Sequence, residues 1–220
     1  MFTVTEMEAI LERHSVRSYQ DKKIEKEKIE KLNALISECN EKGGLHIQLI
    51  EDAGDTFNRL LNRFMGLGSA PSVIACIGKD TDDLDEKTGY YGEKIVLYAQ
   101  QLGLNTCWAG TFNKKNVRAE IGNGERLVIV IAVGYGVNGG KPRKSKKPDQ
   151  VVRGGIAGKP DWFIKGTECA LLAPTAVNQQ KFEIVLKDDG SAEINDKGGI
   201  LSKVDKGIVK YHFEAGAGQH

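Results

Sequence analysis

Two short stretches carry the polar side chains that could do chemistry, and they lie at opposite ends of the chain. Near the N-terminus, "RHSVRSY" places Arg13, Ser15 and Arg17 at alternating positions, where the periodicity of a preceding helix ends. Alternating side chains of an extended segment share one side of it. Two guanidinium groups and a hydroxyl on one side could bind a phosphate, because arginine donors match phosphate oxygens. The other interpretation is a solvated helix end whose cations complement the helix dipole.

The second stretch, "APTAVNQQKFEIV", combines a proline, a hydroxyl and a row of amides: Pro174, Thr175, Asn178, Gln179 and Gln180. Small residues beside a short row of amides let a backbone come close to a flat polar ligand. The pattern predicts the end of a helix, a tight turn and then an alternating strand. Whether the two stretches serve one site stays open at this point.

A third stretch looks like a nucleotide motif. Gly134, Gly136 and Gly139 have the spacing of the dinucleotide fingerprint after a strand. In that fingerprint the glycines open a helix whose N-terminus faces the pyrophosphate. Here they run into a basic, proline-bounded connection without helical periodicity, so we expect a turn. The lysines and arginines of this connection are typical of a solvated loop, and no aromatic residue interleaves them to favour single-stranded nucleic acid.

The elements that must position these stretches follow from hydrophobic periodicity. Helices are expected over residues 5–14, 25–42, 56–71, 89–105, 161–174 and 204–216. Strands are expected over residues 45–52, 72–80, 125–136, 181–188 and 191–196, with a turn or short strand at 106–112. This mixture of helices and hairpin-like strands indicates the α+β class and not a doubly wound parallel sheet.

Composition narrows the class of protein. The 220 residues fit one sizeable domain, or two small ones sharing a core. A net charge of +1 gives no global field that favours nucleic acid or membrane. No apolar run approaches the ~20 residues that span a bilayer. Four scattered cysteines have no zinc-binding spacing, so we expect buried thiols, no metal and a cytoplasmic protein.

A weak internal repeat also runs along the chain. The segment "SECNEKGGLHIQLIED" is echoed by "TECALLAPTAVNQQKFEIVLKD", and "GYYGEKIVLYAQQLGL" is echoed by "VDKGIVKYHFEAGAG". Repeats of this kind can mark an internal duplication. Chance likeness between two α+β pieces would look the same, so the pattern alone leaves the question open.

Four stretches together resemble the nitroreductase family of FMN-dependent oxidoreductases. "ILERHSVRSYQDKKI" resembles its N-terminal signature, and "GEKIVLYAQQLGLNTCWAG" its central helix and the turn after it. "IAVGYGVNGGKPRKSKKPDQVV" is similar to its late strand and basic tail, and "APTAVNQQKF" to its flavin-lining segment. The resemblance implies a nitroreductase-like fold, with a central, mostly antiparallel sheet flanked by helices.

The order of these stretches departs from the usual family. There the flavin-lining segment follows the first basic motif closely, and FMN lies between two subunits of a dimer. Here that segment comes after residue 170. The chain therefore resembles the branch with two nitroreductase-like halves in one chain, a pseudo-dimer. We expect a single globular unit with halves of about 1–138 and 139–220, as a monomer or a homodimer.

The resemblance also implies roles for particular residues. The FMN phosphate is expected to be bound by Arg13, Ser15, Arg17, Lys141 and Arg143. The ribityl chain is expected to lie near the backbone of His14. The polar edge of the flavin is expected to be reached by Thr175, Asn178 and Gln180, with Pro174 packing close by. The backbone N–H groups of Ala109 and Gly110 would face flavin N5 and O4, although Gly110 could simply serve a turn.

The implied activity is transfer of a hydride from NADH or NADPH, through flavin N5, to a nitroaromatic, quinone or similar small acceptor. No side chain is expected to be catalytic, because the flavin carries the chemistry. Trp108 and Phe112 could flank the acceptor or simply pack in the core. A flavin-binding module or carrier with little turnover is the alternative; a nucleic-acid or membrane partner is not expected.

Overall fold

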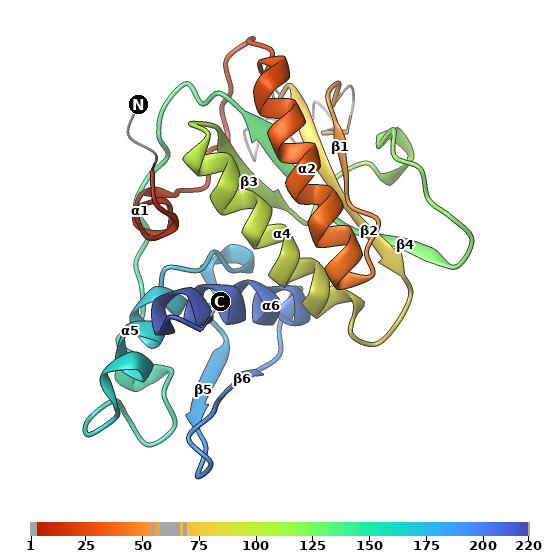
Figure 1. The fold of residues 1–220 in the computed structure, drawn as a ribbon. Coiled ribbons are helices and arrows are strands. Elements are labelled where there is room, and N and C mark those ends of the chain that lie inside the picture. Colours follow the sequence, from red (N-terminus) through yellow and green to blue (C-terminus); the bar gives the residue numbers. More distant parts are fainter. Residues whose placement is uncertain (1–3, 54–55, 58–66, 68–69, 220) are drawn as a thin grey trace.

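The computed structural model describes residues 4–53, 56–57, 67 and 70–219 (Figure 1). Most of the helix predicted over residues 56–71 lies outside these ranges. A four-stranded sheet and the helices on it make up the upper part of the molecule in Figure 1, and a smaller layer of two helices and a hairpin lies below.

The central sheet is antiparallel throughout, with strand order β1-β2-β4-β3. Its strands are β1 (Gln48–Ile50), β2 (Ser72–Lys79), β3 (Asn105–Ala109) and β4 (Glu125–Gly134). Strands β2 and β4 form its centre and are buried on both faces, which explains their continuous apolar sequences. The expected antiparallel α+β architecture is confirmed.

Alternation along β2 and β4 sends side chains to two different cores. On one face Ile74 and Ile131 pack under α2 (Lys26–Gly43) and α4 (Leu84–Gln101). On the other face Val130 and Ala132 pack against Val16 and Tyr19. The segment after α1 (Glu6–Glu12) is therefore fastened across the sheet by its own apolar residues.

The helix ends follow from local sequence. Thr5 and Glu8 form the predicted capping box at the start of α1. Helix α4 begins at Leu84, earlier than the expected residue 89. Hydrophobic periodicity missed its first turn, because that turn carries acids instead of an apolar stripe. Asp85 is held there by Arg126, whose Nη2 donates to Oδ1 at 2.8 Å.

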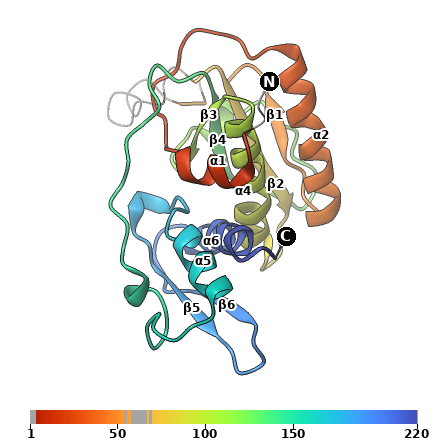
Figure 2. The same cartoon turned by 60° about the vertical axis from the view of Figure 1, so that its left-hand side comes forward.

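The smaller layer comes from the C-terminal part of the chain. It contains α5 (Asp161–Ala170), β5 (Phe182–Leu186), β6 (Ala192–Asp196) and α6 (Ser202–Ala217). Strands β5 and β6 pair only with each other among the described strands. Three aromatic rings pack edge to face between α5 and α6: Trp162, Phe163 and Phe213. The connection after β4 runs along one side of the molecule from the sheet to this layer (Figure 2). It contains the 3-10 turn η3 (Pro148–Gln150), and shorter turns elsewhere are η2 (Lys114–Asn116) and η4 (Ala176–Asn178).

Two glycines let α4 and α6 pack backbone to backbone. A Cβ added at Gly89 would lie 2.0 Å from the carbonyl oxygen of Val204, and one added at Gly207 would lie 2.0 Å from that of Glu86. The contacts are reciprocal, because each glycine meets the residue three positions before the other. Such self-complementary contacts are typical of a twofold interface.

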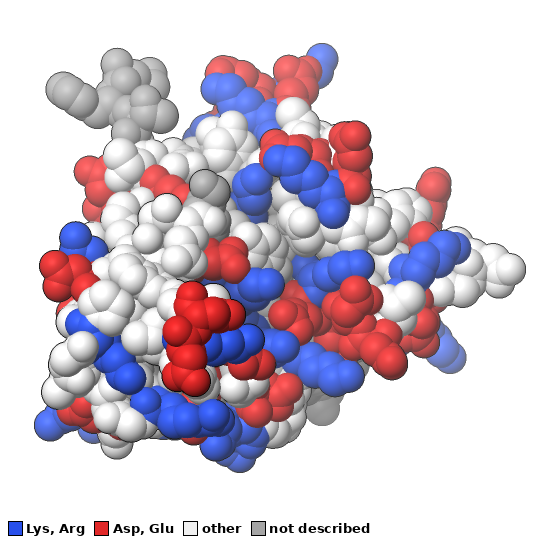
Figure 3. All heavy atoms as spheres, turned by 60° about the horizontal axis from the view of Figure 1, so that its bottom comes forward, with Lys and Arg blue, Asp and Glu red and all other residues white. Residues whose placement is uncertain are grey.

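The surface carries no large region of one charge on the face seen in Figure 3, where acidic and basic side chains alternate. Among the described residues, no helix has the length and apolar character needed to cross a membrane. Within the same ranges, no group of histidine, cysteine and acidic side chains is arranged to hold a metal ion.

Candidate functional site

The first polar motif is extended, as its alternation predicts. Ser15 forms a parallel bridge with Thr106 of β3, and the Val16 amide donates to the Thr106 carbonyl oxygen at 3.0 Å. Tyr19 forms an antiparallel bridge with Gly136, just after β4. Val16 between them points into the core, so Ser15 and Arg17 lie on the opposite side of the segment, where they line a cavity.

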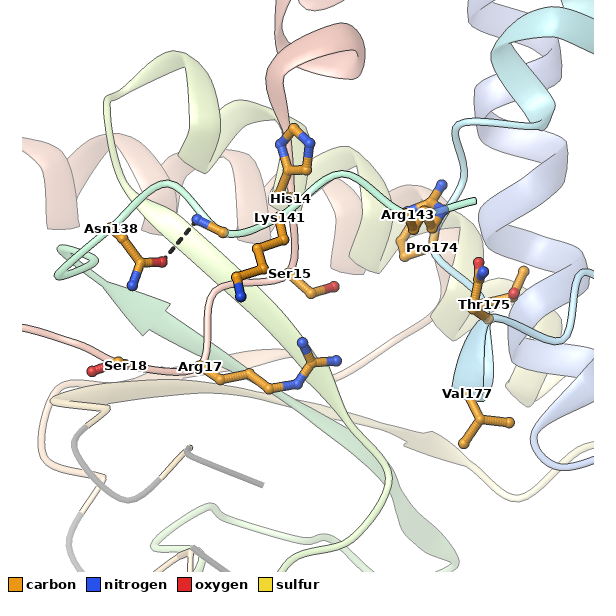
Figure 4. A pocket seen from close by; sticks show the side chains of 12 residues that line it. His14, Ser15, Arg17, Ser18, Asn138, Lys141, Arg143, Pro174, Thr175 and Val177 are labelled. Atoms are coloured by element: carbon orange, nitrogen blue, oxygen red, sulfur yellow. Dashed lines mark hydrogen bonds between the residues drawn. The ribbon is translucent and has the colours of Figure 1, made fainter. Parts of the chain in front are cut away.

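This first cavity has a volume of about 540 Å³ and is lined by three stretches of the chain. The first motif contributes His14, Ser15, Arg17 and Ser18. The connection after β4 contributes Asn138, Gly140, Lys141 and Arg143, and the second motif contributes Pro174, Thr175, Val177 and Asn178. Figure 4 shows the side chains of Arg17 and Lys141 approaching from one side and those of Thr175 and Val177 from the other.

Gly140 permits the close approach of the connection to the first motif. Its φ is +83°, and a Cβ there would lie 2.7 Å from the Cβ of His14. Its amide also donates to the side-chain oxygen of Asn138 at 3.0 Å, the bond dashed in Figure 4. Any other residue would be strained at this φ and would push the wall of the cavity outward.

Arg13 does not line the cavity, although it belongs to the same motif. It is the C-cap of α1, its side chain is buried, and its Nε lies 3.7 Å from Oε1 of Glu93. Nε and Nη2 of this guanidinium have no hydrogen-bond partner. Burial lowers the pKa of Arg13, and the nearby Glu93 carboxylate opposes that shift.

Arg143 brings a second guanidinium to the edge of the cavity. Its Nη2 donates to the carbonyl oxygens of Leu172 and Ala173, the latter at 2.7 Å, while its buried Nε has no partner. Burial and then repulsion by Arg13 lower its pKa to about 10. With Arg17 and Lys141 in the lining, the region holds more positive charge than the single Glu93 carboxylate balances, so it favours an anion.

The basic connection and the second motif are joined by hydrogen bonds. The side-chain amides of Asn178 and Gln180 donate to the Lys144 carbonyl oxygen at 2.9 and 3.0 Å. The Lys146 amide donates to Oε1 of Gln180 at 2.8 Å. Two of the amides noticed in the sequence thus hold the wall of the cavity together.

The second motif also contains strained backbone. Val177, Asn178 and Gln180 have φ values of +46°, +55° and +45°. Asparagine tolerates this region, but a β-branched valine there is a genuine outlier. The Val177 side chain is 84% exposed, so no core packing holds it in place. Strain of this kind persists where surrounding contacts impose it, and it clusters at functional sites.

A second cavity of about 380 Å³ adjoins the first and shares five lining residues with it: Ser15, Arg17, Pro174, Thr175 and Val177. Its remaining wall is mainly apolar and includes Trp108, Ile129, Ile200, Leu201 and Ile208. The two cavities therefore form one polar-to-apolar site that runs between the central sheet and α6.

Trp108 is held in that wall by a buried polar network. Its Nε1 donates to Oε2 of Glu93 at 2.7 Å, and Nε2 of His212 lies 2.8 Å from Oε1 of the same carboxylate. A Cβ at Gly92 would lie 2.5 Å from the indole ring, so the glycine makes room for it. With Arg13 at the end of α1, the network connects α1, α4, β3 and α6.

The second cavity has one acidic lining residue among the described residues, Asp205 in the first turn of α6. Its carboxylate accepts from the Ala176 amide at 2.9 Å and from Nε2 of Gln179 at 2.7 Å. Burial raises its pKa to about 6, and those two hydrogen bonds counteract the shift.

Most of the residues singled out in the sequence meet at these cavities. Gly110 lines the second cavity, as does Trp108, whereas Phe112 is partly buried and packs against the core on the other face of the sheet. Arg13, Ala109 and Gln180 line neither cavity. Sequence reasoning missed Asp205, because an acid in the first turn of a helix is a common dipole partner and gave no separate signal.

The comparisons with known proteins concern nearly the whole chain. The model of a family described as "Putative TM nitroreductase" matches residues 5–217. A solved structure from Thermotoga maritima, described as "a putative nitroreductase", is similar with a TM-score of 0.72 and 24% identity, covering 97% of this chain and 83% of that chain. No curated protein sequence matches.

Two shorter solved structures show a more distant likeness. A nitroreductase family protein from Streptococcus pneumoniae has a TM-score of 0.54 and 15% identity, covering 68% of this chain and 99% of that chain. A protein from Parabacteroides distasonis, described as "Putative NADH dehydrogenase/NAD(P)H nitroreductase", has a TM-score of 0.51 and 20% identity, covering 69% and 98%. At these identities, structural likeness establishes the fold alone.

Proposed function

The chain belongs to the nitroreductase family whose model spans residues 5–217, and we propose that it is an FMN-dependent NAD(P)H oxidoreductase. Bound FMN would supply the hydride chemistry between NADH or NADPH and a nitroaromatic, quinone or similar acceptor. The chain's own residues bind and orient the reactants. Because the flavin would carry out the hydride transfer, the proposal requires no catalytic side chain.

One observation carries this proposal: three cationic side chains, Arg17, Lys141 and Arg143, line one open cavity, and part of the guanidinium hydrogen-bonding capacity in this region is unused. Nε and Nη2 of Arg13 and Nε of Arg143 have no hydrogen-bond partner, while Arg17 and Lys141 face the cavity. A buried polar group without a partner is costly, and a nearby anion would offset that cost. These residues fit a dianionic phosphate such as that of FMN.

Roles follow from the linings. Arg17, Lys141 and Ser15 would bind the phosphate directly, and Arg143 with its neighbour Arg13 would add positive potential. Pro174 and Thr175 line both cavities and would lie along the ring system. The apolar wall around Trp108 and Ile208 would exclude water from the face where the acceptor binds.

We further propose that one FMN lies between two halves of a single chain, about 1–138 and 139–220. The reciprocal packing of Gly89 and Gly207 across α4 and α6 supports an internal twofold relation. The lining also supports it, because Ser15 and Arg17 come from one side of the proposed boundary and Pro174 and Thr175 from the other. The second half carries two strands where the first carries four, so any duplication has diverged.

The absorption spectrum of the purified protein tests the function. We expect a yellow protein, or one that takes up added FMN with a flavin absorption band, and loss of that band when NADH or NADPH is added without oxygen. A colourless protein that ignores added FMN contradicts the proposal. Retention of the oxidised band with both donors would instead favour a flavin carrier with little turnover.

A further inference from the structure

We infer that Asp205 makes the second cavity selective for uncharged, apolar aromatic acceptors and against anionic ones. The inference rests on the proposed function, because it takes the first cavity to be filled by an anionic cofactor. It adds a residue that determines specificity and narrows the class of acceptor.

The preference for apolar aromatic acceptors follows from the rim of the second cavity. Val177 and Ile200 are 84% and 65% exposed, and both line the cavity. Leu201 lies beside them with φ +55°, and a Cβ added at Gly110 would lie 2.6 Å from its Cδ1. Exposed apolar side chains around a cavity favour binding of a ligand with a flat apolar surface.

The selectivity against anions follows from the two ionisable residues that line the second cavity, Arg17 and Asp205. Arg17 also lines the first cavity, where its guanidinium would be paired with the cofactor phosphate. The carboxylate of Asp205 is then the charge left facing an acceptor. Asp205 is only 8% exposed, so water screens it poorly and an anion placed near it would be repelled.

The state of Asp205 supports this role at neutral pH. Burial raises the pKa of its carboxyl to about 6, so the group is ionised above that pH and takes up a proton below it. Its hydrogen-bond donors are the Ala176 amide and the Gln179 side-chain amide, and the other charged residue in the cavity lining is Arg17. Discrimination against anions should therefore be strong at about pH 8 and weaken as the pH falls through about 6.

The test measures binding and not turnover. The FMN-loaded, oxidised protein is titrated calorimetrically, without NAD(P)H, with 4-nitrobenzyl alcohol and with 4-nitrobenzoate, which differ in charge but share the nitrophenyl group. We expect the alcohol to bind at least about tenfold more tightly at about pH 8. In Asp205→Asn, which keeps an oxygen to accept the Ala176 amide, the two affinities should become similar.

A second variant, Gln179→Ala, distinguishes an effect of the Asp205 charge from an effect of the loop that packs on it. It removes the side-chain amide that donates to Asp205 and to the Ile200 carbonyl oxygen but leaves the carboxylate, so it should keep the preference for the alcohol. Equal affinities in the unmodified protein, a preference that survives Asp205→Asn, or a preference lost in Gln179→Ala would each overturn the inference. FMN uptake is measured beforehand by absorption, so failure of the proposed function would be seen separately.

Discussion

Arg17 and Arg13 belong to one motif and carry the same charge, yet their surroundings give them different tasks. Arg17 is exposed and faces the cavity, whereas Arg13 is buried 3.7 Å from the carboxylate of Glu93. The alternation in the sequence could not separate them, because the break in direction occurs at the cap of α1. Arg13 is where the helix ends, and the extended segment begins after it.

At the residue scale we predict that Arg17→Ala weakens FMN binding by about 1.5–3 kcal/mol, the range of a charge-assisted hydrogen bond. The loss should appear in a fluorescence titration with FMN and should shrink at high salt, because Arg17 is exposed. Lys144→Ala is the matched control. Lys144 is also cationic and exposed, but it lines neither cavity and only its carbonyl is used. Equal losses in both variants would point to a general charge effect.

The elements were largely predictable, since most of them bury one apolar face. The helices at residues 26–43 and 202–217 and the strands at 72–79 and 125–134 follow directly from periodicity. The close packing of α4 on α6 was not predictable from that signal. It depends on Gly89 and Gly207, and a glycine inside a helix shows nothing in sequence about which backbone it meets.

At the element scale we predict that Gly89→Ala and Gly207→Ala each lower the free energy of unfolding by about 2–3 kcal/mol. The added Cβ would meet a backbone carbonyl oxygen at 2.0 Å in both cases, so the two helices must separate. Chemical denaturation measures the loss, with Glu41→Ala on the exposed face of α2 as the control. Similar losses in the two glycine variants agree with a twofold relation; a loss in only one would count against it.

At the scale of the whole molecule, the two polar motifs lie far apart in sequence but line the same cavities. Ser15 and Thr175 line the same cavities, although one follows the first helix and the other precedes the C-terminal hairpin. The order of the motifs pointed to this arrangement through the family resemblance. Which side chains face the cavities depends on packing that no local pattern encodes, as the buried Arg13 and Gln180 demonstrate.

The proposed pseudo-dimer predicts one FMN for each chain, bound without help from a second copy. All three stretches that line the first cavity come from this chain, so dilution should not release the flavin by separating subunits. We expect absorption to give one FMN for each chain. In a wide dilution series, the fluorescence anisotropy of the flavin should report the fraction of FMN bound, and that fraction should follow the FMN affinity alone. Analytical ultracentrifugation over the same range reports the oligomeric state. Flavin release that follows dissociation of a dimer, or one FMN for every two chains, would place the site between separate chains.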